Sequence, residues 1–246
     1  SFPTRRSSDL THVFVPVGGG GLAAGVAVYI KQLLPDVKVI GVEAEGSACL
    51  KAALAAGLPC SVTRRGPVPD QLDALVAALE ASASADVIVT SGGASVGDHD
   101  LIIPALRAWG AELDFWKVAI KPGKPLLVAR KERQIVLGLP GNPVSSFVTG
   151  WLFLLPLLRQ LSGAADPLPL KRTVRLASDL AAGGDRREFL RGVLADGGAT
   201  PALSQDSGAL AALAGSNCLI DRAANSPVLP AGTDVSVYPL ENGGIA

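Results

Sequence analysis

The sequence predicts an α/β fold with a largely parallel, three-layer arrangement of sheet and helices, followed by a small β-barrel-like domain. Up to about residue 164, strand-like apolar runs alternate with helical patterns, as in sheets that carry helices on both faces. From about residue 165, short β-like runs recur among Gly, Pro and Asp, which is typical of small barrels. The 246 residues are 48% hydrophobic, which is ample for a buried core.

Composition and charge exclude several classes of function. Lys and Arg together number 22 and Asp and Glu also number 22, without a long run of either sign, so no nucleic-acid partner is expected. The three cysteines, Cys49, Cys60 and Cys218, have no metal-ligand spacing, and they fit a reducing cytoplasm. The apolar stretch 147–158 is shorter than the roughly 20 residues of a membrane helix. It therefore predicts a buried helix and no membrane partner.

The first regular elements predict a βαβ unit with a phosphate-shaped turn. The strand "HVFVPV" leads into Gly18, Gly19, Gly20 and Gly21, and a helix and the strand "VKVIGVEAE" follow. Consecutive glycine N–H groups at a helix start can cradle an anion. A plain strand-to-helix turn seldom needs four glycines, so phosphate binding is the favoured interpretation.

Residues 11–57 resemble threonine dehydratase, a fold-type-II pyridoxal-phosphate enzyme, in "VPVGGGGLAAGVA" and "KVIGVEAEGSACLKAALAAG". The resemblance implies that the glycines are a vestigial loop for the cofactor phosphate. Such chemistry needs a Schiff-base lysine, and Lys31, Lys38 and Lys51 match no such position. Use of pyridoxal phosphate is therefore not expected.

The predicted α/β domain, residues 58–164, contains helices and strands in alternation. The expected elements are helix "DQLDALVAALEASA", strand "DVIVT", helix "LIIPALRAWG", strands "FWKVAI", "LLVAR" and "QIVLGL", and the apolar helix. The expected β domain, residues 165–246, includes "KRTVRLAS", "REFLRGVLA", "ATPALS", "NCLIDRA" and "TDVSVYPL".

The loop "TSGGASVGDHD" follows a strand and opens a helix. Gly92 and Gly93 allow close approach of a ligand, and Asp98 and Asp100 supply oxygen ligands for Mg²⁺ beside a phosphorylated substrate. A polar turn with Asp100 as helix N-cap explains the same residues equally well.

In "FWKVAIKPGKP", strand alternation places Lys117 and Lys121 on one face, with Lys124 just beyond. This spacing favours a compact anion site over a lysine-protected edge strand.

The segment "GLPGNPVSS" predicts a capped helix start. Asn142 suits the N-cap, Pro143 the first helical position and Ser145 the third. By itself this is only a stable helix start. Three such loops at strand ends of one sheet would line the crevice where α/β folds bind ligands.

These three motifs, in this order and spacing, resemble the molybdopterin molybdenumtransferase family, which includes bacterial MoeA and the E domain of gephyrin. The resemblance covers the chain from about residue 57 and implies a molybdopterin-binding domain before the β domain. It implies catalytic roles for Asp100, Lys117 and Lys121, with Asp100 also the metal ligand. The implied substrate-binding residues are Asp70, Gly92, Gly93, Ser95, Lys124, Pro140, Asn142, Pro143, Ser145, Arg191 and Ser207.

The resemblance also implies the reaction: molybdate is inserted into adenylylated molybdopterin and AMP is released, with a divalent cation such as Mg²⁺. The resemblance further implies a homodimer and a cytoplasmic location. Two alternatives remain open, a threonine or serine dehydratase fragment and a non-catalytic gephyrin-like scaffold.

The change of resemblance predicts a seam within residues 50–57, and residues 1–10 resemble a translated sequencing adapter. We therefore expect an artefactual tail and a chimeric join of two coding sequences, without the N-terminal domains of the family. Strands near 13–17 or 37–42 would then pair with an exposed edge of the α/β sheet.

Overall fold

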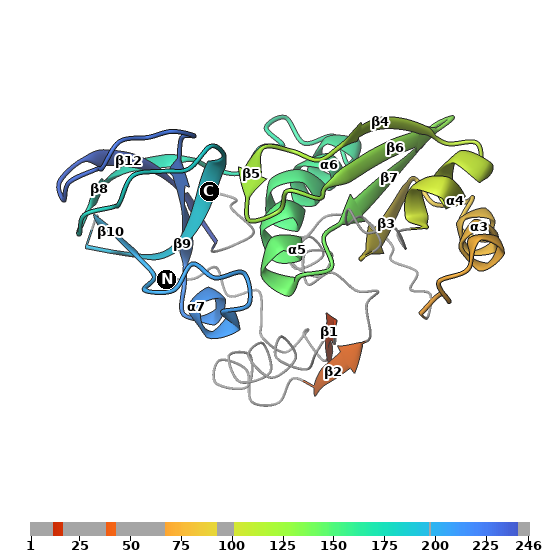
Figure 1. Cartoon of the computed structure of the whole chain (residues 1–246), viewed down its shortest axis with the longest axis horizontal. Helices are drawn as coiled ribbons and strands as arrows, with labels where there is room; N and C mark the ends of the chain where they lie inside the picture. The colour runs from red at the N-terminus through yellow and green to blue at the C-terminus, as the bar shows by residue number, and fades with distance from the viewer. Residues whose placement is uncertain (1–11, 17–37, 43–66, 93–100, 197, 241–246) are drawn as a thin grey trace.

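The computed structural model describes residues 12–16, 38–42, 67–92, 101–196 and 198–240. Two bodies dominate it, an α/β domain and a β-barrel (Figure 1). The α/β domain contains α3 (Leu72–Glu80), β3 (Val87–Ser91), α4 (Ile102–Ala108), β4 (Glu112–Trp116), β5 (Ile120–Lys121), β6 (Leu127–Lys131), β7 (Gln134–Leu139), α5 (Pro143–Thr149), the π-helix η2 (Gly150–Leu154) and α6 (Leu155–Leu161). The barrel region contains β8 (Arg172–Leu176), β9 (Arg187–Ala195), β10 (Gly198–Pro201), α7 (Leu210–Ala214), β11 (Cys218–Arg222) and β12 (Asp234–Pro239).

The sheet of the α/β domain has the strand order β3-β7-β6-β4. Strands β3 and β7 are parallel, whereas β6 runs antiparallel to both β7 and β4. The described sheet is therefore mixed rather than largely parallel. The reason is the short turn at Glu132, where a positive φ of 54° joins β6 directly to β7 as a hairpin.

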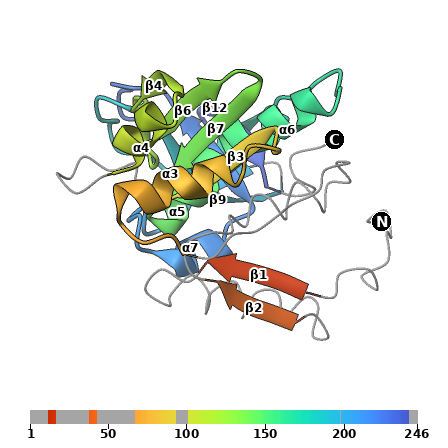
Figure 2. The same cartoon turned by 90° about the vertical axis from the view of Figure 1, so that its right-hand side faces the viewer.

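Helices cover both faces of this sheet, which confirms the three-layer arrangement (Figures 1 and 2). On one face, α5, η2 and α6 bury Val148, Trp151 and Leu154 against Leu137 and Leu139 of β7. On the other face, α3 and α4 pack on residues from β6 and β7 that include Leu127, Ala129 and Val136. Successive residues of β7 thus point into the apolar cores on opposite faces of the sheet, as expected for a pleated strand.

The apolar segment is a core helix, as predicted. Residues Pro143–Leu161 form 19 residues of continuous helix with a mean hydropathy of 1.3, so length and composition alone would permit a membrane span. However, 67% of this helix's most apolar stretch is buried inside the protein.

The second body is a closed barrel with an additional strand. Strands pair in the order β8-β12-β11-β9, and β10 closes the ring by pairing with both β9 and β8. The barrel-like prediction is confirmed. Strand β5 pairs in parallel with the start of β9, Ile120 with Arg187 and Lys121 with Glu188. At Glu188, one edge of β9 pairs with β11 and the opposite edge pairs with β5. Further along β9, from Gly192 to Ala195, β10 pairs with the same edge as β5.

Strands β1 (His12–Pro16) and β2 (Lys38–Val42) form a separate parallel pair (Figure 2). The parallel pairing agrees with the predicted βαβ unit. Among the described strands, however, they pair only with each other, so the expected addition to the edge of the α/β sheet is not observed. Strands β1 and β2 satisfy one edge of each other by pairing, and the four-stranded sheet forms without these two strands.

Gly192 in β9 offers a test of barrel packing. A Cβ there would lie 2.8 Å from the carbonyl oxygen of Thr200 and 2.9 Å from Cδ1 of Ile220. We expect Gly192→Ala to lower the free energy of unfolding by about 1–3 kcal/mol, because the backbone must shift. Denaturant titration measures this. Gly184→Ala is the matched control, since a Cβ at Gly184 meets no atom within 4 Å. Equal stability of the two variants would contradict the packing described.

Candidate functional site

The ends of three strands meet at one edge of the α/β sheet. Strands β3, β7 and β4 run in the same direction, because β7 and β4 are both antiparallel to β6. The Gly92 N–H donates to the carbonyl oxygen of Leu139 at 3.1 Å. A Cβ on Gly141 would lie 3.4 Å from Cα of Gly92. The loop that starts at Gly92 and the loop that contains Gly141, the first and third of the predicted loops, therefore begin side by side.

The helix start after β7 has the predicted cap. The Asn142 side-chain oxygen accepts a hydrogen bond from the Ser145 N–H at 3.1 Å, and Pro143 is the first residue of α5. Pro140 and Ser145 are buried. The cap thus holds the turn rigidly at the sheet edge, next to the loop that starts at Gly92.

The lysine segment differs from the predicted strand. Strand β4 ends at Trp116, and Lys117 has a positive φ of 79°, a conformation that costs a side-chain-bearing residue about 1 kcal/mol. The Lys117 N–H bonds the carbonyl of Leu126 and the Val118 N–H bonds that of Lys124, both at 2.9 Å. The segment therefore turns as an irregular hairpin, and strand alternation does not arrange its lysines.

Lys117 and Lys124 line one pocket of about 470 Å³. Its other lining residues are Val118, Ala119, Asp185 and Arg186, so the barrel side contributes two of them. The Lys117 ammonium also lies 3.9 Å from the ring centroid of Trp116, a cation–π contact. Three cations against one carboxylate give the lining of this pocket an excess of positive charge, which favours anions.

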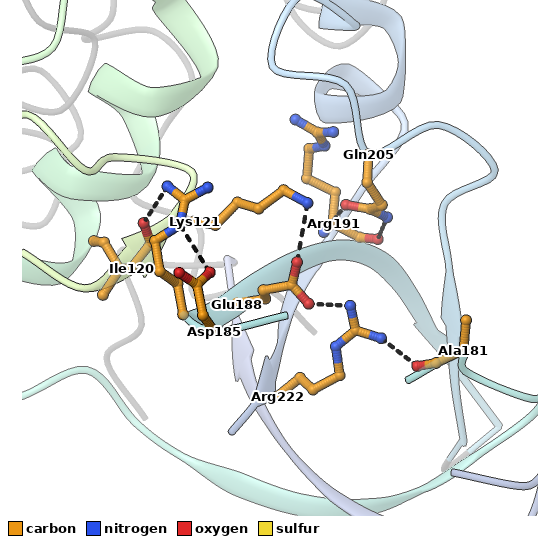
Figure 3. A network of polar contacts seen from close by, with 9 residues as sticks. Ile120, Lys121, Ala181, Asp185, Glu188, Arg191, Gln205 and Arg222 are labelled. Atoms are coloured by element: carbon orange, nitrogen blue, oxygen red, sulfur yellow. Dashed lines mark hydrogen bonds and ion pairs between the residues drawn. The ribbon is translucent and has the colours of Figure 1, made fainter. Parts of the chain in front are cut away.

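Lys121 lies in a different environment. It lines a second pocket of about 200 Å³ together with Glu188 and Arg222, and its Nζ is 3.0 Å from Oε1 of Glu188 (Figure 3). The Lys121 side chain is 51% exposed and the Glu188 side chain only 3%. The predicted trio of lysines is therefore divided between two neighbouring pockets.

Glu188 is held as a carboxylate by two cations. Burial opposes its ionisation, but hydrogen bonds from Arg222 and Lys121 outweigh burial and lower the pKa of Glu188. Arg222 in turn donates to the carbonyl oxygen of Ala181 at 2.6 Å (Figure 3). A buried carboxylate shared in this way ties the lysine segment to the barrel.

Arg191 is buried, with 1% of the residue exposed. Its Nη2 donates to the carbonyls of Ser204 at 3.2 Å and Asp206 at 2.9 Å, and burial lowers the pKa of its guanidinium. Gln205 exchanges hydrogen bonds with the Arg191 backbone (Figure 3). Arg191 thus shapes the segment that leads to Ser207, and both residues lie apart from the lining of the two pockets.

The remaining predicted residues lie elsewhere. Asp70 is exposed just before α3 and lines neither pocket. Gly93, Ser95, Asp100 and the loop Gly18, Gly19, Gly20 and Gly21 lie outside the described residues. Sequence reasoning missed Asp185, Arg186, Glu188 and Arg222. Glu188 lies in the expected strand "REFLRGVLA" and Arg186 directly precedes that strand, but only the pairing with β5 identifies them as neighbours of the lysines.

Comparisons with known proteins agree with this architecture. Residues 42–160 match a family described as "Probable molybdopterin binding domain", and residues 173–240 match "MoeA C-terminal region (domain IV)". The molybdopterin molybdenumtransferase of Nostoc sp. is 37% identical over 177 residues, which cover 65% of this chain and 39% of that protein. Residues 42–160 and 173–240, here called the MoeA-type domains, are thus similar to a probable molybdopterin-binding domain and to the C-terminal region of MoeA, respectively.

A MoeA structure and a threonine dehydratase complete the comparison. The molybdopterin biosynthesis MoeA protein of Pyrococcus horikoshii superposes with a TM-score of 0.61 and 25% identity over 93% of this chain and 52% of its own. L-Threonine dehydratase from Salmonella typhimurium is 69% identical over 62 residues, which are 25% of this chain and 12% of that enzyme. The chain thus spans less than half the length of the Nostoc molybdenumtransferase and of the Salmonella dehydratase.

The cap at Asn142 can be tested through stability. Asn142→Ala removes the oxygen that accepts the Ser145 N–H, and we expect unfolding to become easier by about 1 kcal/mol. Asn142→Asp keeps a capping oxygen and should retain most of the stability. Thermal and denaturant unfolding measure both variants; an alanine variant as stable as the parent would refute the cap.

The buried carboxylate predicts a pH-dependent stability. Because the folded state lowers the pKa of Glu188, its contribution is present above the unfolded glutamate pKa of about 4.3 and lost as the pH falls through the folded value. We expect Glu188→Gln to cost about 1–3 kcal/mol at pH 7. The difference from the parent should shrink at acidic pH.

Denaturant titrations across pH measure this difference. Asp185→Asn is the control, because that side chain is 92% exposed, and it should change stability by less than about 0.5 kcal/mol. A Glu188→Gln deficit that stays constant down to low pH would contradict the ionised pairing.

Proposed function

We propose that the MoeA-type domains bind molybdopterin and act in the insertion of molybdate into adenylylated molybdopterin, with release of AMP. The observation that carries the proposal is the cationic pocket of Lys117 and Lys124 beside the sheet edge where β3, β4 and β7 end. Ligands of open α/β sheets bind at such an edge. The similarity to molybdopterin molybdenumtransferases supports the choice of ligand.

The chemistry of this substrate suits the pocket. Adenylylated molybdopterin contains a phosphoanhydride, and its cleavage leaves additional negative charge on the departing AMP. Ammonium groups fixed before the reaction stabilise such developing charge. The Lys117 ammonium is held against the Trp116 ring, and hydrogen bonds of the hairpin hold the backbones of Lys117 and Lys124. These contacts support a role for both lysines in binding the phosphates.

The cation, assembly and location of the protein are part of the proposal. We propose from the family resemblance that Asp100 and the substrate's own phosphates hold Mg²⁺; residues 67–92, 101–196 and 198–240 contain no cluster of three metal-ligating side chains. Carboxylates and phosphates are the usual ligands of Mg²⁺. A homodimer in the cytoplasm is proposed from the family resemblance.

The described residues favour neither alternative function. The dehydratase resemblance concerns a segment whose glycine loop lies outside them, and no groove for a partner peptide stands out among the two pockets. We keep the transferase as the proposed function.

Calorimetric titration with adenylylated molybdopterin tests the proposal. We expect binding by the parent chain and a loss of affinity of about tenfold or more for Lys117→Ala combined with Asp100→Ala, since charge-assisted contacts disappear. Lys171→Ala is the matched lysine control, because Lys171 pairs with Asp221 outside the pocket. A folded parent that gives no heat, or a double variant that binds as the parent does, would overturn the proposal.

A further inference from the structure

Arg186 is the cation that the barrel side contributes to the lysine pocket. It follows Asp185 and directly precedes β9, whereas Lys117 and Lys124 come from the α/β domain. The pairing of β5 with β9 brings these distant parts of the chain together, and the Arg187 N–H bonds the carbonyl of Ala119 at 3.0 Å. The pocket is therefore built across two domains of one chain.

The Arg186 guanidinium is anchored without being saturated. Its Nη1 donates to the carbonyl of Ile120 at 3.3 Å, and its Nε lies 3.8 Å from Oδ1 of Asp185. Ile120 and Asp185 lie close together beside the Lys121–Glu188 pair (Figure 3). The Asp185 side chain is 92% exposed, and such exposed ion pairs contribute little. These contacts use at most two of the five guanidinium donors.

The neighbouring arginine has a different role. Arg187 forms a bidentate pair with Asp221 at 2.7 and 2.6 Å and lines neither pocket. Of the two arginines, therefore, only Arg186 lines the pocket of Lys117 and Lys124. Two adjacent arginines thus provide a test residue and its matched control.

Lys121 does not supply the pocket's third cation. Its ammonium is paired with the buried Glu188 carboxylate at 3.0 Å, and it lines the smaller pocket. Arg186 lines both pockets and carries a planar fork that matches phosphate oxygens better than an ammonium does.

We propose that Arg186 is a ligand-binding residue that holds a phosphate group together with Lys117 and Lys124, so that the C-terminal barrel supplies one wall of the substrate site. The identification of the complete ligand as adenylylated molybdopterin rests on the proposed function. The pocket's preference for a phosphate-class anion follows from its three cations alone.

The test compares Arg186→Gln with Arg187→Gln in calorimetric titrations at fixed ionic strength. Two probes are used, adenylylated molybdopterin and inorganic pyrophosphate, the latter representing the phosphoanhydride. We expect Arg186→Gln to weaken both affinities about tenfold and Arg187→Gln to stay within about twofold of the parent. Arg186→Lys keeps the positive charge but loses the planar guanidinium, so its affinity for both probes should lie between those of Arg186→Gln and Arg187→Gln. Thermal unfolding identifies any variant that fails to fold.

The outcomes separate this inference from the proposed function. If Arg186→Gln and Arg187→Gln bind alike while Lys117→Ala loses affinity, the role of Arg186 is refuted and the proposed function stands. If pyrophosphate binding depends on Arg186 but adenylylated molybdopterin does not bind, the anion site stands and the proposed function fails. If the parent binds neither probe, both are overturned.

Discussion

The pairing of β5 with β9 is the contact on which the rest of the site depends. Two residues of the α/β domain, Ile120 and Lys121, enter the barrel wall beside Arg187 and Glu188. Ile120 also joins the apolar core that contains Phe189 of the barrel and Leu137 of the sheet. Because backbone pairing, core packing and an ion pair coincide here, the two domains share one continuous interior.

This contact explains why the lysines are distributed as they are. The hairpin after β4 must leave the sheet edge to reach β9, and it does so through the left-handed conformation at Lys117. The detour places Lys117 and Lys124 on one pocket and Lys121 against Glu188. Lys121 is held in position by its ion pair with the buried Glu188 carboxylate, whereas Lys117 and Lys124 line the larger pocket.

Local signals in the sequence were reliable where local physics decides the outcome. The Asn142 cap, the Pro143 helix start and the apolar core helix all formed as expected, since they depend on residues within a few positions of one another. The strand predicted from Phe115 to Ile120 is interrupted after Trp116 and resumes at Ile120 in another sheet, because tertiary pairing with the barrel overrides alternation over so short a run. The prediction for Asp100 remains untested.

The sequence by itself determined the α/β class, the barrel-like second domain and the lysine-rich segment, because periodicity, turn residues and motif spacing are written along the chain. Only the tertiary structure decided that the described sheet is mixed and that Arg186 rather than Arg187 joins the lysines. It also decided that Lys121 forms an ion pair with Glu188, which in turn pairs with Arg222. These neighbours are separated by tens of residues, and their proximity arises from strand pairing that no local pattern encodes.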